Sequence, residues 1–388
     1  MSGQRGFAAV EALVALGLLM TVSAAAIGLV VPAQGFTQAH LEASDVMQRV
    51  RTTADALGHD LAGAGAGPHA GVRAGALTKQ VPAVFPYRRT ARNPDPPGTV
   101  RSDTITLWMV PPGLGGTRLT AGAAAGATEL HVEGQMSCGA GARLCDFVAG
   151  GTALLVDESG AHELLVLSAV SDGALLLQHA GQPLTRAFLA GASVLPLVAR
   201  VYGSRYDSAT GAFQLTMADA ATGVDQPVVD HLVSVQFEYA GEPGAPRLLT
   251  PVDPFETTYA PPPPGPGDSV PGFAPGENCV FRRESAEGPP VSRLADLGPP
   301  DGPFVSLDPA MLADGPWCPD GASSVRVDAD LLRIRRVTVT LRFQAASSAL
   351  RGPAGMLYAT GGTGAGARST PDAVARVTVT PRNLVVAR

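Results

Sequence analysis

The chain has 388 residues, of which 45% are hydrophobic and only 16% are charged, and its formal net charge is −6. The hydrophobic content excludes a wholly disordered chain, and the acidic balance argues against a nucleic-acid-binding protein, which would carry a basic patch. The mean hydropathy of +0.16 indicates either an apolar surface or one strongly apolar segment.

The apolar residues are concentrated near the N-terminus. The 25 residues from 7 to 31 read FAAVEALVALGLLMTVSAAAIGLVV and contain one charged residue, Glu11. As a helix this segment would be about 37 Å long, enough to cross a bilayer whose hydrocarbon core is about 30 Å thick. Glycine, proline or a charge interrupts the rest of the chain every few residues. We therefore predict a single membrane span followed by a large domain outside the membrane.

Two ordinary explanations of this segment are a secretory signal peptide and a plain signal anchor. A signal peptide would use Arg5 as its basic region and would be cleaved near Ala24 or Ala33. However, the apolar run exceeds the usual length of about 7–15 residues in signal peptides, and it carries Glu11 near its start. A carboxylate inside a spanning helix costs about 2.5–3.5 kcal/mol on insertion scales, so we expect Glu11 to have a function.

The N-terminal run MSGQRGFAAVEALVALGLL resembles the class III signal of type IV pilins and type II secretion pseudopilins. The resemblance implies that prepilin peptidase cuts after Gly6 and that Phe7 becomes the N-methylated first residue of the mature chain. It also implies that Glu11 is the acid at the fifth mature position. The sequence departs from the common family pattern at Ala8 and Ala9.

This resemblance leads to a hypothesis about Glu11. In filaments of the family, the N-terminal helices bundle in a dry core, where a lone carboxylate would be uncompensated. The positive Phe7 amine of a neighbouring subunit would supply the partner, and such a buried pair can set axial register. The alternative is an acid that is simply tolerated near the lipid headgroups.

After Pro32 the sequence becomes polar but stays periodic, which predicts an amphipathic second half of the same helix. Apolar or small residues repeat at alternating spacings of four and three at Phe36, His40, Ala43, Met47, Val50, Ala54, Leu57 and Leu61. We expect this stripe to pack on a sheet, a kink at Pro32 and a helix end at the glycine-rich run 63–68. The stretch Gln38–Gly67 resembles PilW-type minor pilins and the minor pseudopilin J, although it lacks the basic residues of their pattern.

The rest of the chain shows strand signals without alternating helices, which favours an antiparallel sheet. Val233, Val235, Phe237 and Tyr239 alternate with polar residues, as do the apolar residues from Val337 to Phe343. A small barrel-like β insertion is expected over 127–200. Residues 241–324, rich in proline and glycine, are interpreted as a surface loop or, alternatively, a proline-rich recognition ligand, with 304–317 docking on the sheet.

These patterns predict an α+β fold: a long N-terminal helix, half transmembrane and half amphipathic, packed on an antiparallel β-sheet domain with an additional small β-rich insertion. The expected parts are the leader (1–6), the helix (7–62, with 7–31 in the membrane), an irregular connector (63–100), a β-rich globular domain (101–240), the proline- and glycine-rich insertion (241–324) and C-terminal strands that complete the sheet (325–388).

The four cysteines, Cys138, Cys145, Cys279 and Cys318, allow three disulfide connectivities. Proximity in sequence favours Cys138–Cys145 and Cys279–Cys318, and an even count fits an oxidising compartment. A zinc site made of all four thiolates is the alternative, but the C-x2-C spacing typical of such sites is missing.

Catalytic motifs are weak. The run His162-Glu163-Leu164-Leu165-Val166 begins like the zinc-protease motif H-E-x-x-H but lacks its second histidine and lies in a strand pattern. Asp328 and Asp330 could bind calcium, although solvated charges account for them more simply. We therefore expect no enzymatic activity, no catalytic residues, no metal and no cofactor.

The resemblance implies a minor pilin of a type IV pilus machine. Such a protein spans the inner membrane once with its C-terminal domain in the periplasm, and later lies at the tip of the extracellular pilus. Its implied partners are prepilin peptidase, other minor pilins and the major pilin through the N-terminal helix, and a tip adhesin; nucleic acid is not among them. The alternatives are the equivalent minor pseudopilin of a type II secretion system and an anchored or secreted β-rich binding protein or hydrolase.

Overall fold

The structure is a computed structural model that describes residues 4–65, 82–96, 98–111, 113–139, 141–157, 161–241, 264–270, 273–278, 281–292, 303–315, 317–318, 327–364 and 368–381. Several predicted features fall outside these residues: residues 66–81 of the connector, the prolines at 261–263, Cys279 and a C-terminal strand at 384–386.

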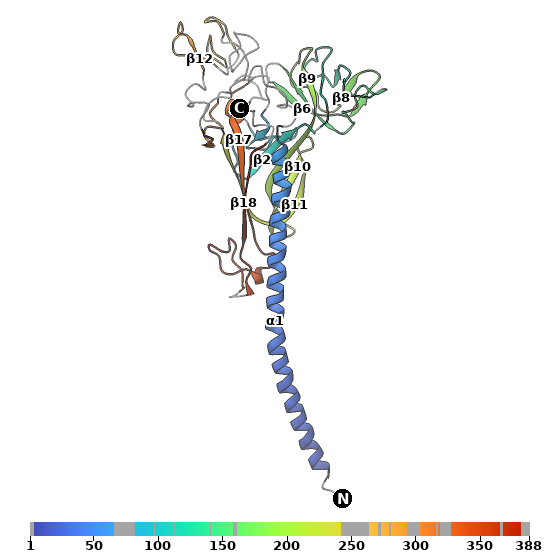
Figure 1. Ribbon diagram of the computed structural model, residues 1–388, viewed down its shortest axis with the longest axis vertical. Helices are drawn as coiled ribbons and strands as arrows, with labels where there is room; N and C mark the ends of the chain where they lie inside the picture. The colour runs from blue at the N-terminus through green and yellow to red at the C-terminus, as the bar shows by residue number, and fades with distance from the viewer. Residues whose placement is uncertain are drawn as a thin grey trace. The chain divides into compact units, whose positions relative to one another are not determined.

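One long helix, α1 (Gln4–Gly63), forms the N-terminal part of the chain and continues through Pro32 (Figure 1). It extends one residue beyond the predicted end. The chain then leaves the helix through Gly65, whose φ of +80° is a left-handed conformation that glycine adopts without steric cost. The Gly65 N–H donates to the carbonyl of Trp108 (2.9 Å), so the helix end is tied to a strand.

The rest of the described chain is β-rich, as the sequence predicts. Its strands are β1 (Val84–Phe85), β2 (Thr104–Met109), β3 (Thr117–Arg118), β4 (Glu129–His131), β5 (Thr152–Val156), β6 (His162–Val166), β7 (Ala169–Ser171), β8 (Leu176–Gln178), β9 (Ser193–Asp207), β10 (Ala212–Asp219), β11 (Asp225–Gly241), β12 (Phe281–Arg283), β13 (Pro290–Ser292), β14 (Val305–Leu307), β15 (Trp317–Cys318), β16 (Val327–Asp328), β17 (Ile334–Phe343) and β18 (Ala373–Val379).

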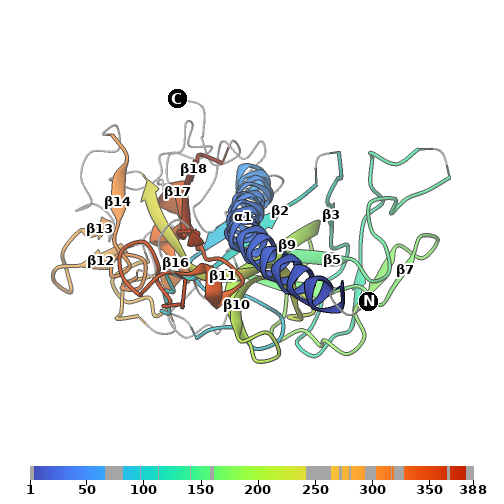
Figure 2. The ribbon, with the colours of Figure 1, turned by 90° about the horizontal axis from the view of Figure 1, so that it is seen from below.

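The main sheet has the strand order β1-β2-β9-β10-β11-β17-β18. β9 pairs antiparallel with both β2 and β10, and β10 pairs antiparallel with β11 (Figure 2). In β17 the apolar side chains predicted to face inwards are all buried. In β11 the predicted residues Val235, Phe237 and Tyr239 are buried and the polar residues at 236 and 238 are exposed, whereas Val233 is only half-buried. The combination of one long helix and a large antiparallel sheet confirms the predicted α+β class.

β9 joins this sheet to a smaller β region. The first residues of β9 pair with β3 and β5, and the later residues pair with β2 and β10. β5 also pairs with β6, while β4, β8 and β7 form a three-stranded sheet. Apolar side chains from these strands and their loops form a core of their own, which includes Leu119, Leu130, Leu155, Leu177 and Phe188. β14 pairs with β11, so the segment expected to dock on the sheet does so.

The chain divides into two compact units. One contains residues 1–52 and 342–374, and the other contains residues 53–341 and 375–388. In the first unit, the Ala346 N–H donates to Glu42 Oε1 (2.5 Å), and the Thr370 hydroxyl donates to the carbonyl of Ala39 (3.1 Å). A segment distant in sequence therefore fastens to the helix just beyond its apolar part.

The predicted buried stripe on the second half of α1 is wrong in its first turns. Phe36 and Met47 are 45% and 53% exposed, and His40 is exposed as well. The buried positions are Ala39, Val46, Val50, Thr53, Leu57, Asp60, Leu61 and Ala64. Apolar residues occupy both of two adjacent stripes, so hydropathy could not choose between them. The stripe that is buried contains two polar residues, Thr53 and Asp60. Asp60 can be buried because residues of β9 form hydrogen bonds with its carboxylate.

Candidate functional site

The residues expected to act in processing and assembly lie at the start of α1. Gly6 and Phe7 are within its first turns, and the side chain of Phe7 lies outside the described part of the structure. Glu11 is exposed, and it has no hydrogen-bond or ion-pair partner among the described residues. The structure therefore leaves this carboxylate available to another molecule.

Every side chain from Ala9 to Val31 is exposed, including large apolar ones such as Leu13 (71%) and Leu29 (76%). Within the described residues, α1 is the one helix that is long and apolar enough to cross a membrane. Burying a leucine side chain is worth about 1.5–3 kcal/mol, so an uncovered apolar rod of this length is strongly unfavourable in water. The segment could be a single membrane span or a signal anchor.

The C-terminal end of α1 carries a buried carboxylate with an extensive set of partners. Asp60 is 2% exposed, and both of its oxygens lie 2.6 Å from Arg200 Nη1 on β9. The hydroxyl of Tyr202, also on β9, donates to Asp60 Oδ2 (2.5 Å). Burial and the adjacent Asp60 raise the pKa of Tyr202 far above its usual value. This network fixes the helix end to the sheet. Asp60 lies within the stretch 38–67 that resembles minor pilins, but no pattern in the sequence indicates its partners Arg200 and Tyr202.

The disulfide predicted between neighbouring cysteines is confirmed. Cys138 and Cys145 are bonded, with their Cα atoms 5.6 Å apart, in a loop beside the smaller β region. Cys279 and the side chain of Cys318 lie outside the described residues, so the second pairing stays a prediction.

Asp328 and Asp330, considered as calcium ligands, lie close to Asp314, and carboxylate oxygens of the three residues are within 4.8 Å of one another. Asp328 accepts from the N–H groups of Asp330 (2.8 Å) and Gly315 (2.7 Å), and Asp330 pairs with the buried Arg333 (2.5 Å). Burial, and then the neighbouring Asp330 charge, raise the pKa of Asp328 to about 8. Arg333 thus balances part of the negative charge of the three carboxylates. Among the described residues, these three acids are the group whose oxygens lie close enough together to hold a cation.

The H-E-x-x-H-like run lies in β6, and its two polar residues have structural partners. Glu163 Oε1 accepts from the Thr185 N–H (2.9 Å), the Thr185 hydroxyl (2.6 Å) and the Arg186 N–H (3.2 Å). His162 Nε2 lies 2.7 Å from Arg89 Nη2. Both residues line a cavity of about 540 Å³. No sequence pattern pointed to this cavity, since Arg89 and His162 are 73 residues apart.

Comparison with known proteins leaves the family open: neither a protein-family model nor a curated protein matches this chain.

Proposed function

We propose that this protein is a minor pilin of a type IV pilus machine, which is inserted in the inner membrane, processed by prepilin peptidase and assembled with other minor pilins to prime the pilus and form its tip. The observation that carries the proposal is Glu11, a single acid in a helical rod whose side chains are all exposed from Ala9 to Val31.

Two facts about this rod support assembly through it. Its apolar surface requires a cover, which a bilayer provides before assembly and neighbouring helices provide afterwards. Glu11 requires a positive partner once water is removed, because an unpaired buried carboxylate is very costly. Cleavage after Gly6 would create such a charge, the α-amino group of Phe7, on each neighbouring subunit. The same reaction thus produces both the subunit and the group that positions it.

The second half of the helix suits the same role. In the first compact unit, Glu42 and Ala39 of the helix accept hydrogen bonds from Ala346 and Thr370. In the second compact unit, Asp60 ties the end of the helix to Arg200 on β9. The β domain can therefore be carried on the filament surface while the apolar half packs inside. The domain would lie in the periplasm before assembly and outside the cell afterwards.

N-terminal mass spectrometry of the chain purified from membranes and from sheared filaments tests the proposal. We expect the mature chain to begin at N-methylated Phe7, and we expect Gly6→Val to keep the leader. Gly17→Val is the matched control, because a side chain at Gly17 would meet no other atom within 4 Å, and it should be processed normally. A chain beginning near Ala25 or Gln34 would identify a signal peptide, and an uncut chain beginning at Met1 would identify a plain anchor. Either result would overturn the proposal.

A deletion strain separates the pilus from the type II secretion system. Loss of surface pili with normal protein secretion is the expected phenotype. Loss of secretion with normal pili would assign the chain to the minor pseudopilins instead.

A further inference from the structure

The 540 Å³ cavity lies where the main sheet meets the smaller β region. Its walls come from residues 87–96, from Trp108 on β2, from the start of β6 and from the turn at 181–185. Junctions between substructures are common places for ligand sites, and the volume is within the usual range of about 300–1,000 Å³. All of these residues belong to one compact unit.

Arg89 is held in a defined orientation at this cavity. Its guanidinium carbon lies 5.3 Å from the ring centroid of Phe85 and 5.5 Å from that of Trp108. Its Nη2 lies 2.7 Å from His162 Nε2. Arginine can only donate, so His162 accepts through Nε2 and its ring is neutral, with the proton on Nδ1. Arg89 is therefore fixed by uncharged groups and keeps its whole positive charge.

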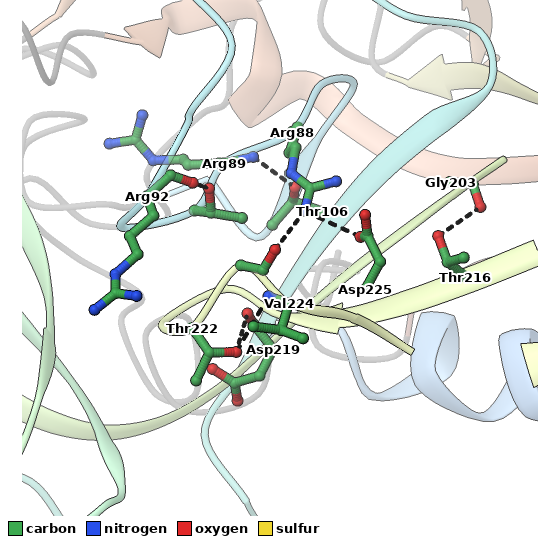
Figure 3. Close-up of polar contacts among 12 residues, drawn as sticks. Arg88, Arg89, Arg92, Thr106, Gly203, Thr216, Asp219, Thr222, Val224 and Asp225 are labelled. Carbon is green, nitrogen blue, oxygen red and sulfur yellow. Dashed lines mark hydrogen bonds and ion pairs between the residues drawn. The ribbon is translucent and has the colours of Figure 1, made fainter. Parts of the chain in front are cut away.

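The nearby carboxylates are engaged with other groups. Asp95 accepts from the backbone N–H of Arg88 (2.7 Å) and pairs with Arg101 (3.0 Å). Glu163 uses one oxygen to accept three hydrogen bonds. Figure 3 shows Arg88 turned towards Asp225 (3.0 Å), whereas the guanidinium groups of Arg89 and Arg92 extend away from that pair. Among the described residues, no carboxylate lies within ion-pair distance of either Arg89 or Arg92.

One further side chain at the cavity offers a donor. Gln182 uses Oε1 to accept from the Val166 N–H (2.8 Å), which leaves its amide NH2 as a donor. The cavity therefore has an excess of donors and positive charge, which an acceptor-rich anion would satisfy.

We propose that this cavity binds a small organic carboxylate whose carboxyl group pairs with Arg89. A planar guanidinium placed beside aromatic rings offers parallel N–H donors, which match the two oxygens of a carboxylate. The volume is much larger than a bare inorganic ion needs, and the exposed prolines of the lining, Pro94, Pro96 and Pro183, provide apolar surface for the body of the ligand. This site is independent of the N-terminal helix and of its role in assembly.

Titration calorimetry on the full-length chain in detergent, at constant ionic strength, tests the proposal with benzoate, its uncharged analogue benzamide and inorganic phosphate. We expect benzoate to bind with a Kd in the millimolar range or tighter, and benzamide and phosphate to bind at least tenfold more weakly. Benzamide lacks the charge, and phosphate leaves the apolar surface uncovered. Equal binding of benzoate and benzamide would overturn the proposal, as would binding of phosphate alone.

Variants locate the site. Arg89→Gln should weaken benzoate binding at least tenfold, and Arg89→Lys should weaken it less, because lysine keeps the charge but loses the paired donors. The control is Arg118→Gln on β3, an exposed arginine outside the cavity lining, which should bind benzoate normally. Circular dichroism establishes that each variant is folded. Normal benzoate binding by the folded Arg89→Gln variant would disprove the assignment, and so would an equal loss in Arg118→Gln.

Discussion

Two carboxylates on the same helix have opposite surroundings. Asp60, near the end of α1, is buried, and its partners Arg200 and Tyr202 come from its own chain. Glu11, near the beginning, is exposed among apolar side chains that are exposed too, and the described chain supplies it with no partner. The carboxylate at the end of the helix thus has its partners within the chain, whereas the carboxylate near the beginning has none among the described residues.

The difference separates the part of α1 that the fold of this chain stabilises from the part that, under the proposed function, is stabilised by neighbouring subunits. Burial of polar groups is tolerated where partners are fixed in advance, as β9 fixes them for Asp60. No comparable element meets the first half of α1 in the described structure. Variants at buried positions of the second half should therefore change the stability of the isolated subunit, whereas variants in the first half should change only its behaviour with membranes and neighbours.

The largest effect is expected for Glu11→Leu. The variant should enter the membrane and be processed at least as well as the parent, because it removes a charge that costs about 2.5–3.5 kcal/mol to insert. Its incorporation into filaments, measured by immunoblot of sheared pili, should fall at least tenfold. Thr21→Leu, an exposed position on the same segment, is the control and should incorporate normally. Normal incorporation of Glu11→Leu would show that the acid is merely tolerated.

A pair of adjacent positions tests which helix face is buried. Val46 is 1% exposed and Met47 is 53% exposed. Val46→Asp would bury a charge and should lower the free energy of unfolding by more than about 3 kcal/mol. Met47→Asp should change it by less than about 0.5 kcal/mol. Denaturant unfolding of the full chain in detergent measures both free energies of unfolding. Equal effects of the two substitutions would show that the face of α1 that carries Val46 is not the buried one.

Asp60→Ala should lower the free energy of unfolding by about 2–3 kcal/mol, since it leaves Arg200 and the buried Tyr202 hydroxyl without their acceptor. The exposed Asp55, one turn earlier on α1, gives the matched control, Asp55→Ala. Processing and membrane insertion should be the same in both variants. A similar small effect of the two substitutions on unfolding would mean that the Asp60 network contributes little.

A pH dependence of stability is also expected at Asp328. Its pKa in the folded chain is raised to about 8 by burial and by Asp330, so the folded state binds more protons than the unfolded state between about pH 4 and 8. The free energy of unfolding should therefore fall as the pH rises through this window.

Asp328→Asn should flatten this dependence, whereas Asp308→Asn, at an exposed position, should leave it unchanged. Unfolding curves at pH 5 and pH 8 provide the measurement. A repeat with millimolar calcium examines the acidic group directly, because a bound cation would stabilise the ionised carboxylates and reverse the trend. An identical pH dependence in Asp328→Asn and the parent would exclude this residue as its source.

Much of the fold was predictable because its signals are local. A 25-residue apolar run, alternation along β11 and β17, and a seven-residue spacing between Cys138 and Cys145 each lie within one segment of sequence. The helix face was not predictable in the same way, because apolar residues occupy two adjacent stripes. Tertiary contacts with the sheet determine which stripe is buried, because β9 places Arg200 and Tyr202 within hydrogen-bond distance of Asp60.

The sequence alone was enough to predict an apolar helix with a single acid followed by an antiparallel β domain. Hydropathy is the reason for the helix, and the alternation of apolar and polar residues is the reason for the strands. Only the tertiary structure decided which helix face is buried, and only it brought Arg89 to Phe85, Trp108 and His162 around one cavity. Those contacts depend on strand register, such as Trp108 opposite Ala199. Register is set by pairing between distant segments, and no local pattern along the chain encodes it.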